Sequence, residues 1–293
     1  MVYLNGQLVP LEDAKIPVLE RGFIFGDGVY ETIPVYSRVP FRLDEHLARL
    51  ERSLAAVRIR NPRSRNEWRT ILAALIERQA FEDQSIYLQV TRGVARRDHA
   101  FPVDVAPTVF AMANPLVSPP REQVENGARA VSAEDFRWQR CDIKSTSLIG
   151  NVLLRQLSVE AGAAETILFR DGVLTEASAS NVFVVKDGVI LAPPKSSFIL
   201  AGITYDVVVE LAQGAAIPLE FRDIPEVEVR AADELWVTSS GKEVLAIVEL
   251  DGRPIGPGKP GALFRRLHAL YQDYKLKVMR AGAKAAAHHP EAA

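Results

Sequence analysis

The sequence of 293 residues contains a single cysteine, Cys141, so no disulfide can form within the chain. This lack of cysteine suits a reducing compartment. The chain also has no apolar run of about 20 residues, which a membrane-spanning helix requires. Its N-terminus, MVYLNGQLVP, lacks the charged and apolar segments of a signal peptide. We therefore expect a cytoplasmic protein with no membrane partner.

The chain also has no excess of positive or negative charge. The 35 basic and 37 acidic residues give a net charge of −2, which provides no electrostatic reason to expect nucleic acid as a partner. The basic run 58–69 has no second basic cluster to extend it, and we interpret it as a solvated turn. Zinc-ligand spacings and the Walker and Rossmann glycine patterns are absent, so we expect no metal site and no nucleotide site of those kinds.

Composition and length indicate a globular protein of about two domains, since 48% of the residues are apolar and 25% are charged. Prolines 115, 119 and 120 mark the strongest linker signal. We predict a small N-terminal α+β domain at 1–114, a linker at 115–121, and a larger C-terminal α+β domain at 122–279 that carries Lys144. The low-complexity segment 280–293 is predicted to be a disordered tail.

Periodicity predicts the elements of the first domain. Asn5-Gly6 indicates a hairpin within 2–10. Leucines spaced by three and four predict an amphipathic helix at 44–57, with His46 and Arg49 sharing a face beside the apolar stripe. Glycines 22, 26 and 28 precede a strand in which Val29, Ile33 and Val35 share one face, and we interpret Gly26-Asp27-Gly28 as a tight turn. A further helix is predicted at 66–80, and strands at 85–93 and 107–115.

The second domain is predicted from the same signals. Asp171-Gly172 and Asp187-Gly188 indicate turns between consecutive strands. Thr204 is expected to cap the start of a helix at 201–215. The other predicted elements are a strand at 127–136, a helix at 148–161, strands within 233–250 and a closing helix at 261–280. Strand runs separated from helices favour the α+β class over a doubly wound parallel sheet.

Two residues offer covalent and acid chemistry. Lys144 lies in CDIKSTS, between a strand-like stretch and a helix, and a lysine shielded from water can form a Schiff base. Glu176 lies among small residues through which backbone can approach a ligand, and a carboxylate against a pyridine nitrogen keeps that nitrogen protonated. Taken singly, each residue is more often a surface charge.

Other residues could bind an anion. Gly202-Ile203-Thr204 places free N–H groups and a hydroxyl at a helix start. Arg49 could contact a phosphate through two hydrogen bonds, and Ser239 and Ser240 could add hydroxyl donors. Each of these signals is weak alone, because every helix has such an end and most arginines are solvated.

Several runs occurring in one order are more specific. RGFIFGDGVYE, IYLQVTRG, RRDHAFP, FRWQRCDIKS, LTEASASNVF and GITYDVV together resemble the class IV aminotransferases, which are pyridoxal-phosphate enzymes of fold type IV. The resemblance extends to about residue 278 and is strongest to the D-amino-acid branch of the class. It implies transamination between a D-amino acid, such as D-alanine, and a 2-oxo acid, such as 2-oxoglutarate.

The resemblance also implies roles for individual residues. Lys144 matches the lysine that binds pyridoxal 5'-phosphate and moves the substrate α-proton, and Glu176 matches the acid at the pyridine nitrogen. The remaining cofactor-binding residues are Arg49, Ser180, Asn181, Ile203, Thr204, Ser239 and Ser240. The group that binds the substrate carboxylate is Tyr30, Arg97 and His99. In the family the loop carrying this arginine and histidine reaches the neighbouring subunit's site, which implies a homodimer with shared sites.

Some positions depart from the family pattern. Pro34 replaces an expected basic residue, Arg96 and Asp98 flank the substrate-binding arginine, and Gly241-Lys242 replaces a hydroxyl-rich stretch. These departures affect the expected side-chain preference more than the reaction type. Three alternatives stay open: a branched-chain L-amino-acid aminotransferase, a 4-amino-4-deoxychorismate lyase, and a non-catalytic protein of the same fold.

Overall fold

Residues 1–280 are described by a computed structural model, in which the chain divides into two compact units. Within the described part, unit 1 comprises residues 1–116, 143–148 and 278–280, and unit 2 comprises 117–142 and 149–277. The prediction that Lys144 belongs to the C-terminal domain is therefore wrong, because the segment 143–148 belongs to unit 1. Residues 278–279, predicted with the C-terminal domain, also belong to unit 1. The tail predicted to be disordered lies, apart from Arg280, outside the described residues.

Unit 1 contains a six-stranded antiparallel sheet in the order β2-β1-β6-β5-β3-β4. Its central pairing joins β3 to β5 from Gly28↔Thr91 to Val35↔Gln84. The hairpin predicted at Asn5-Gly6 is confirmed, and Asn5 adopts the positive φ that such a turn requires. The strands are β1 (Val2–Leu4), β2 (Gln7–Val9), β3 (Gly28–Tyr36), β4 (Val39–Pro40), β5 (Gln84–Thr91) and β6 (Thr108–Pro115).

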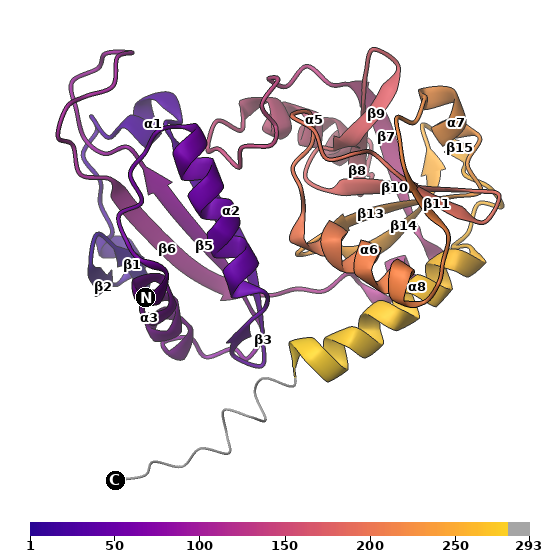
Figure 1. The fold of residues 1–293 in the computed structure, drawn as a ribbon, viewed down its shortest axis with the longest axis horizontal. Helices are drawn as coiled ribbons and strands as arrows, with labels where there is room; N and C mark the ends of the chain where they lie inside the picture. Colours follow the sequence, from indigo (N-terminus) through magenta and orange to yellow (C-terminus); the bar gives the residue numbers. More distant parts are fainter. Residues whose placement is uncertain (281–293) are drawn as a thin grey trace, which may run out of the picture. The chain divides into compact units, whose positions relative to one another are not determined.

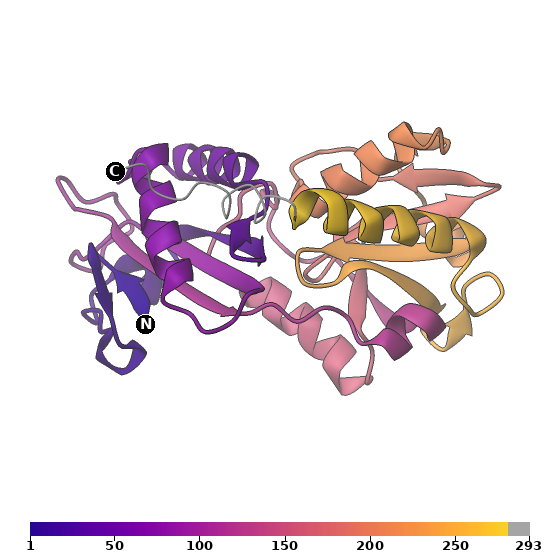
Figure 2. The same ribbon diagram turned by 90° about the horizontal axis from the view of Figure 1, so that it is seen from below.

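Two helices of unit 1 cover one face of this sheet (Figures 1 and 2). These are α2 (Leu43–Ala56), whose leucines 47, 50 and 54 are buried, and α3 (Arg65–Glu77), which starts at a Ser64–Glu67 capping box and buries Trp68. The first confirms the amphipathic helix predicted at 44–57, and the second confirms the helix predicted at 66–80. Two short helical segments, η1 (Leu11–Asp13) and α1 (Arg21–Phe25), were not predicted because each is shorter than two helical turns.

The segment 143–148 is fixed to unit 1 through the turn that ends α1. Gly26 has a left-handed conformation, with φ of +64°, and its carbonyl accepts hydrogen bonds from Thr146 Oγ1 at 2.8 Å and Ser147 Oγ at 3.0 Å. Further along, Val29 of β3 pairs with Ser145 as an antiparallel bridge, and Tyr30 N donates to Lys144 O at 2.9 Å. These bonds explain why Lys144 belongs to unit 1. The tight turn predicted at Gly26-Asp27-Gly28 is confirmed by its own hydrogen bond, in which Gly28 N donates to Gly26 O at 2.9 Å.

Unit 2 contains a nine-stranded sheet in the order β12-β11-β10-β13-β14-β7-β8-β9, with β15 paired to β14. Most pairs are antiparallel, but β11–β12, β14–β7 and β7–β8 are parallel, so the α+β prediction is confirmed. The end strand β9 also contacts β10, the strand that follows it in sequence. The strands are β7 (Ala128–Glu134), β8 (Glu165–Arg170), β9 (Val173–Ala177), β10 (Asn181–Lys186), β11 (Val189–Ala192), β12 (Leu219–Phe221), β13 (Glu234–Ser239), β14 (Glu243–Leu250) and β15 (Arg253–Pro254).

Apolar contacts attach the helices of unit 2 to this sheet. Tyr205 of α6 (Ile203–Gly214) stacks on Phe183 of β10, and Phe264 of α8 (Ala262–Tyr274) meets Trp236 of β13 edge-on. The helix α5 (Ile149–Glu160) packs on β7 and β8 through the buried Leu154. The remaining helical segments are α4 (Arg121–Asn126), α7 (Glu226–Arg230) and the π-helical turn η2 (Lys275–Met279).

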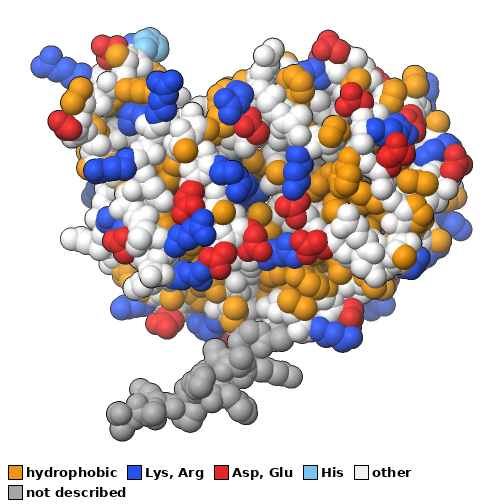
Figure 3. Space-filling view, in the orientation of Figure 1, with side chains coloured by type: hydrophobic (Ala, Val, Ile, Leu, Met, Phe, Trp, Pro, Cys, Tyr) orange, Lys and Arg blue, Asp and Glu red, His pale blue; other side chains and the backbone are white. Residues whose placement is uncertain are grey.

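Within residues 1–280 no helix is long and apolar enough to cross a membrane. Basic and acidic side chains are interspersed on the face drawn in Figure 3, as the near-zero net charge leads one to expect.

Gly26→Ala tests the importance of the turn that holds 143–148. A Cβ at this position would lie 2.8 Å from Ser147 Oγ and 3.2 Å from Ser147 Cα, in addition to the unfavourable φ. We expect the free energy of unfolding to fall by about 2–3 kcal/mol, measured by urea denaturation.

Gly188→Ala is the matched control, because Gly188 has a φ of +76° but no atom within 4 Å of the position that a Cβ would take. This substitution should lower the free energy of unfolding by about 1–2 kcal/mol, from backbone strain alone. Equal losses in the two variants would contradict a specific role for the contact between Gly26 and Ser147.

Candidate active site

Lys144 is half-buried in unit 1, with its amine over an aromatic ring. Its Nζ lies 4.2 Å from the centroid of the Tyr30 ring, and its backbone N donates to Ser53 Oγ at 3.4 Å. Tyr30 stacks in turn on Tyr87 of β5, with ring centroids 5.4 Å apart. The structure therefore brings two of the predicted residues, Lys144 and Tyr30, into contact.

A buried charge cluster lies on the neighbouring residues of β3 and α2. Glu31 accepts two hydrogen bonds from Arg49, Nε to Oε1 and Nη2 to Oε2, each at 2.8 Å. His46 Nδ1 lies 2.8 Å from Glu31 Oε2. Burial raises the pKa of Glu31, but the charge and hydrogen bonds of Arg49 and His46 outweigh it and lower the pKa to about 2. The carboxylate is therefore ionised throughout the neutral range.

His46 has a free acceptor. Burial lowers its pKa and favours the neutral ring, whose Nδ1 must then donate to Glu31. Its Nε2 is left as an acceptor, buried and without a hydrogen-bond partner in the described residues. A ligand donor would satisfy this atom. The sequence predicted a role for Arg49 but missed Glu31, although Glu31 falls on the same strand face as Val29, Ile33 and Val35, where an acid needs a partner.

Glu176 is a buried carboxylate of unit 2, near the end of β9. Its Oε1 accepts from Arg137 Nη1 at 2.6 Å, and its Oε2 accepts from Asn181 Nδ2 at 3.2 Å and from Leu200 N at 3.0 Å. Arg137 is itself held by two hydrogen bonds to Asp135, each of 2.9 Å. The sequence missed Arg137 and Asp135 as supports, although both precede Lys144 by fewer than ten residues and Arg137 lies in a run that carries the family resemblance.

Burial raises the pKa of Glu176 to about 7, although the charge and hydrogen bond of Arg137 lower it. The nearby Asp135 carboxylate raises it further, and it also shares the guanidinium. Glu176 can therefore gain or lose a proton near neutral pH. This proton affinity suits a residue whose partner is a basic ring nitrogen.

The start of α6 lies against Asn181. Gly202, not Thr204, is the N-cap, because Gly202 is extended and its carbonyl accepts the first helical bond, from Asp206 N at 3.1 Å. The predicted capping by Thr204 is therefore wrong, and Thr204 is buried in the first turn. A Cβ on Gly202 would lie 2.2 Å from Asn181 Oδ1, so only glycine permits this approach.

The two predicted serines lie at the end of β13, with Ser239 as its last residue and Ser240 in the turn that follows. Ser239 Oγ accepts from Lys242 N at 3.1 Å, and Lys242 Nζ lies 3.4 Å from Ser180 Oγ. Thr238, one residue earlier, pairs with Asn181 across the ladder, and its buried Oγ1 has no partner among residues 1–280. Ser180, Asn181 and Ser239 are thus gathered in unit 2.

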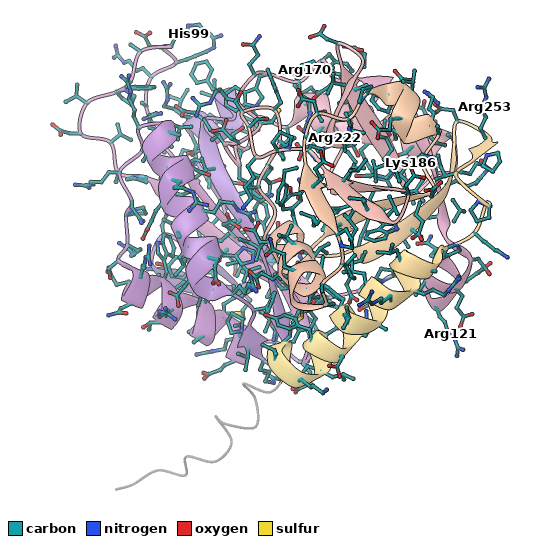
Figure 4. The ribbon with its side chains drawn as sticks, turned by 45° about the vertical axis from the view of Figure 1, so that its right-hand side comes forward. His99, Arg121, Arg170, Lys186, Arg222 and Arg253 are labelled. Carbon is teal, nitrogen blue, oxygen red and sulfur yellow. The ribbon has the colours of Figure 1, made fainter. Side chains whose placement is uncertain are left out.

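Arg97 and His99 are exposed on the loop after β5, and they contact Phe25 of α1. The Arg97 guanidinium carbon lies 5.5 Å from the Phe25 ring centroid, and the His99 ring lies 5.4 Å from it. Arg21 holds this loop by donating to Asp98 O at 2.6 Å. Figure 4 shows His99 at the end of the loop, directed away from the unit 1 sheet. The structure groups Arg97 with His99, but it does not bring either to Tyr30.

The residues present fit pyridoxal 5'-phosphate. Unit 1 offers an amine at Lys144 and the unsatisfied His46 Nε2, and unit 2 offers a buried acid at Glu176 and the unsatisfied Thr238 Oγ1. The start of α6 adds free N–H groups, which favour a phosphate. No group of three potential ligands within residues 1–280 is arranged to hold a metal ion.

Comparisons with known proteins agree with this chemistry. The model of the family "Amino-transferase class IV" matches residues 28–250. The chain is 40% identical over 272 residues to the D-alanine aminotransferase of Bacillus licheniformis, covering 93% of this chain and 96% of that protein. It is 38% identical over 274 residues to the D-alanine aminotransferase of Staphylococcus aureus strain MW2, covering 93% and 97%.

A solved structure has the same fold over nearly the whole chain. It is the branched-chain amino acid aminotransferase of T.th. with pyridoxamine 5'-phosphate, with a TM-score of 0.88 and 28% identity. The match covers 97% of this chain and 96% of that one.

Glu176→Gln should change how the stability of the cofactor-free protein depends on pH. The folded-state pKa of about 7 is above the usual 4.5, so the folded state binds the extra proton. The contribution of this bound proton to the free energy of unfolding is fully present below pH 4.5 and is lost as the pH rises through 7. Gln mimics the protonated acid, so the variant should gain about 3 kcal/mol over the native protein between pH 4.5 and 8.

Urea denaturation of both cofactor-free proteins at several pH values measures this difference. Parallel stability curves would show that Glu176 does not take up a proton near neutral pH.

Proposed function

Since the chain belongs to the class IV aminotransferases, we propose that it transfers an amino group between a D-amino acid and a 2-oxo acid, with pyridoxal 5'-phosphate as its cofactor. The strongest support for a D-amino acid substrate is the sequence identity of 36–40% to D-alanine aminotransferases, which extends over 93% of the chain. Identity to the solved branched-chain aminotransferases is 24–28%. The branched-chain reaction is therefore the second candidate.

Pyridoxal 5'-phosphate, when bound, supplies a ring that accepts the electron pair released at the substrate α-carbon. Lys144 would hold the cofactor through its Nζ. Once the substrate amine has replaced that nitrogen, the freed Nζ would be able to accept and return the substrate α-proton. Its half-buried position beside the Tyr30 ring limits access of water to the amine.

Glu176 would hold a proton at the pyridine nitrogen of the bound cofactor. Three donors fix the orientation of its carboxylate, namely Arg137, Asn181 Nδ2 and Leu200 N. The positively charged ring nitrogen would lower the pKa of Glu176 and so stabilise the ion pair. Because Arg137 is anchored by Asp135, the acid does not need to reorganise when the ring binds.

The family resemblance assigns the phosphate to Arg49 and to the start of α6. Arg49 would contribute its guanidinium while Glu31 keeps that group oriented. In unit 2 the buried first turn of α6 contributes N–H groups and a hydroxyl. The other proposed cofactor residues are Ser180, Asn181, Ser239 and Ser240, of which the first three are linked by hydrogen bonds or strand pairing around Thr238 and Lys242.

The substrate carboxylate is assigned to Arg97, His99 and Tyr30. An arginine can bind a carboxylate through two hydrogen bonds, and histidine and tyrosine can add donors. Fixing the carboxylate on one side of Lys144 selects the isomer whose α-hydrogen faces the amine. Since Arg97 and His99 lie on Phe25 rather than on Tyr30, we propose that they serve the site of a second subunit.

A homodimer is supported by an exposed apolar stripe on α5. Its members are spaced as one helix face, i, i+3, i+4 and i+8: Ile149, Val152, Leu153 and Leu157. Ile149 is 73% exposed, although helices of folded monomers usually direct such residues into the core. A second copy of the chain is the partner that this stripe best fits. Cytoplasmic location remains an expectation from the sequence.

D-alanine, but not L-alanine, should change the absorbance of the bound cofactor in a half-reaction without a 2-oxo acid. Lys144→Ala should abolish the change.

Arg97→Ala should raise KM for D-alanine by about 10–100-fold, because a charge-assisted hydrogen bond contributes about 1.5–3 kcal/mol. Arg96→Ala, which removes the neighbouring exposed arginine, is the control and should change KM less than about threefold.

A preference for L-leucine or L-valine would replace the D-specific assignment with the branched-chain reaction. Release of pyruvate from 4-amino-4-deoxychorismate would identify a lyase. A purified protein that binds no pyridoxal 5'-phosphate would contradict the enzyme assignment altogether.

Leu153→Asp should convert the dimer to a monomer, measured by analytical ultracentrifugation, because a charge in the apolar stripe would be buried without a partner. Val227→Asp is the control, since Val227 is 77% exposed, against 53% for Leu153, and lies on another helix, α7. Mixing Arg97→Ala with Lys144→Ala subunits should also restore one active site in each mixed dimer. Mixed dimers that stay inactive would exclude shared sites.

A further inference from the structure

Lys242 has no role in the proposed reaction, and it occupies the stretch where the sequence departs from the family pattern. It lies in the turn between β13 and β14, with a side chain that is mostly shielded from solvent. Its Nζ lies 3.4 Å from Glu165 Oε2 and 3.4 Å from Ser180 Oγ. A lysine directed inward from a turn, toward a buried acid, is unlike a solvated surface lysine.

Glu165 is fully buried at the first residue of β8. It accepts hydrogen bonds from Ser178 Oγ at 3.1 Å and Ala179 N at 2.8 Å. These bonds define the loop 178–180, which connects β9 to β10. A buried carboxylate is costly without an opposite charge, and Lys242 is the cation that pairs with it.

The loop 178–180 lies directly between residues assigned to the cofactor. It begins two residues after Glu176 and ends just before Asn181, and it is closed by Ala177 N donating to Ser180 O at 2.8 Å. A shift of this loop would change the direction of the Asn181 side chain, which donates to Glu176. The position of the Glu176 carboxylate therefore depends on the loop that Glu165 holds.

Hydrogen bonds of the backbone at Lys242 and of the next residue hold the turn 239–242 in place. Lys242 N donates to Ser239 Oγ at 3.1 Å, which sets the direction of that hydroxyl. The next residue, Glu243, has a left-handed conformation with φ of +53°, and its buried carboxylate accepts from Lys275, Gln272 and Ser118. A non-glycine residue persists in this conformation only where its surroundings determine it. The turn is thus a rigid base from which Lys242 extends.

We propose that Lys242 is a positioning residue of the cofactor site. Through its ion pair with Glu165 and its contact with Ser180, it locks the loop 178–180 to the turn 239–242. The acid at the pyridine nitrogen and the serine hydroxyls assigned to the phosphate are thereby held in one fixed arrangement within unit 2. This inference rests on the proposed function for its consequence, but the link between the two loops can be tested without any cofactor.

The first experiment measures amide hydrogen exchange in the cofactor-free protein. Lys242→Met removes the charge and keeps the side-chain length, so exchange should accelerate in both 177–181 and 239–243. Lys242→Arg should retain the native exchange in both segments. Lys186→Met is the matched control, since Lys186 pairs with Asp233 at 3.3 Å on the surface of the same unit (Figure 4). It should leave both segments unchanged.

Faster exchange confined to 239–243 would overturn the proposal, because Lys242 would then support only its own turn. Native exchange in the Lys242→Met variant would overturn it as well. If that variant does not fold, amide exchange in Glu165→Gln is compared with exchange in the native protein instead. The proposal then requires faster exchange in both segments of the Glu165→Gln protein.

The second experiment measures binding of pyridoxal 5'-phosphate by absorbance. Lys242→Met and Glu165→Gln should each raise Kd about tenfold, and the double variant should raise it by no more than about twentyfold, because both changes break one link. A hundredfold increase in Kd for the double variant would mean that the two substitutions act independently. That result is expected if Lys242 contacted the phosphate itself, and it would overturn the proposal. Native protein that binds no cofactor would refute the proposed function, while the exchange experiment would still test the link.

Discussion

The hydrogen bond from Tyr30 N to Lys144 O is the constraint on which the reactive part of unit 1 depends. It makes the lysine segment a short partner of β3, so the amine lies over the ring of Tyr30. The next residue of β3, Glu31, points to the opposite face, as strand geometry requires, and meets Arg49 in the interior. One strand therefore sets both the surroundings of the amine and the buried ion pair behind it.

The two units each bury a glutamate against an arginine, with opposite effects on its proton affinity. Glu31 has Arg49 and a second donor in His46, and its pKa falls to about 2. Glu176 shares Arg137 with Asp135, and its pKa rises to about 7. The first arrangement keeps a permanent charge that orients an arginine. The second leaves an acid whose proton affinity can respond to a bound base.

The sequence alone predicted those elements whose structure is determined by local residue patterns. The helix α2 followed from Leu47, Leu50 and Leu54, and the Asn5-Gly6 hairpin from turn chemistry. The assignment of Lys144 to the wrong unit had a different cause, since its partner Tyr30 is distant in sequence and tertiary pairing leaves no local signal. Among the site residues, Lys144, Glu176 and Arg49 were candidates from their residue types, and the motif resemblance assigned their roles. Glu31 was missed because its partners His46 and Arg49 lie 15 and 18 residues away, where no local pattern connects them. Arg137 was missed although its partner Asp135 is only two residues away. Thr204 has the chemistry of an N-cap, but the approach of Asn181 to Gly202 starts the helix earlier.

The route of the chain has a consequence for synthesis on the ribosome. Unit 1 is assembled from residues 1–116, from 143–148 and from a segment that begins at Val278. In that segment the Arg280 guanidinium pairs with Asp83 and Ser37. The N-terminal sheet therefore emerges long before two of the pieces that complete it. Unit 1 cannot finish folding as an independent N-terminal domain, and its last contacts form only after the whole of unit 2 has been translated.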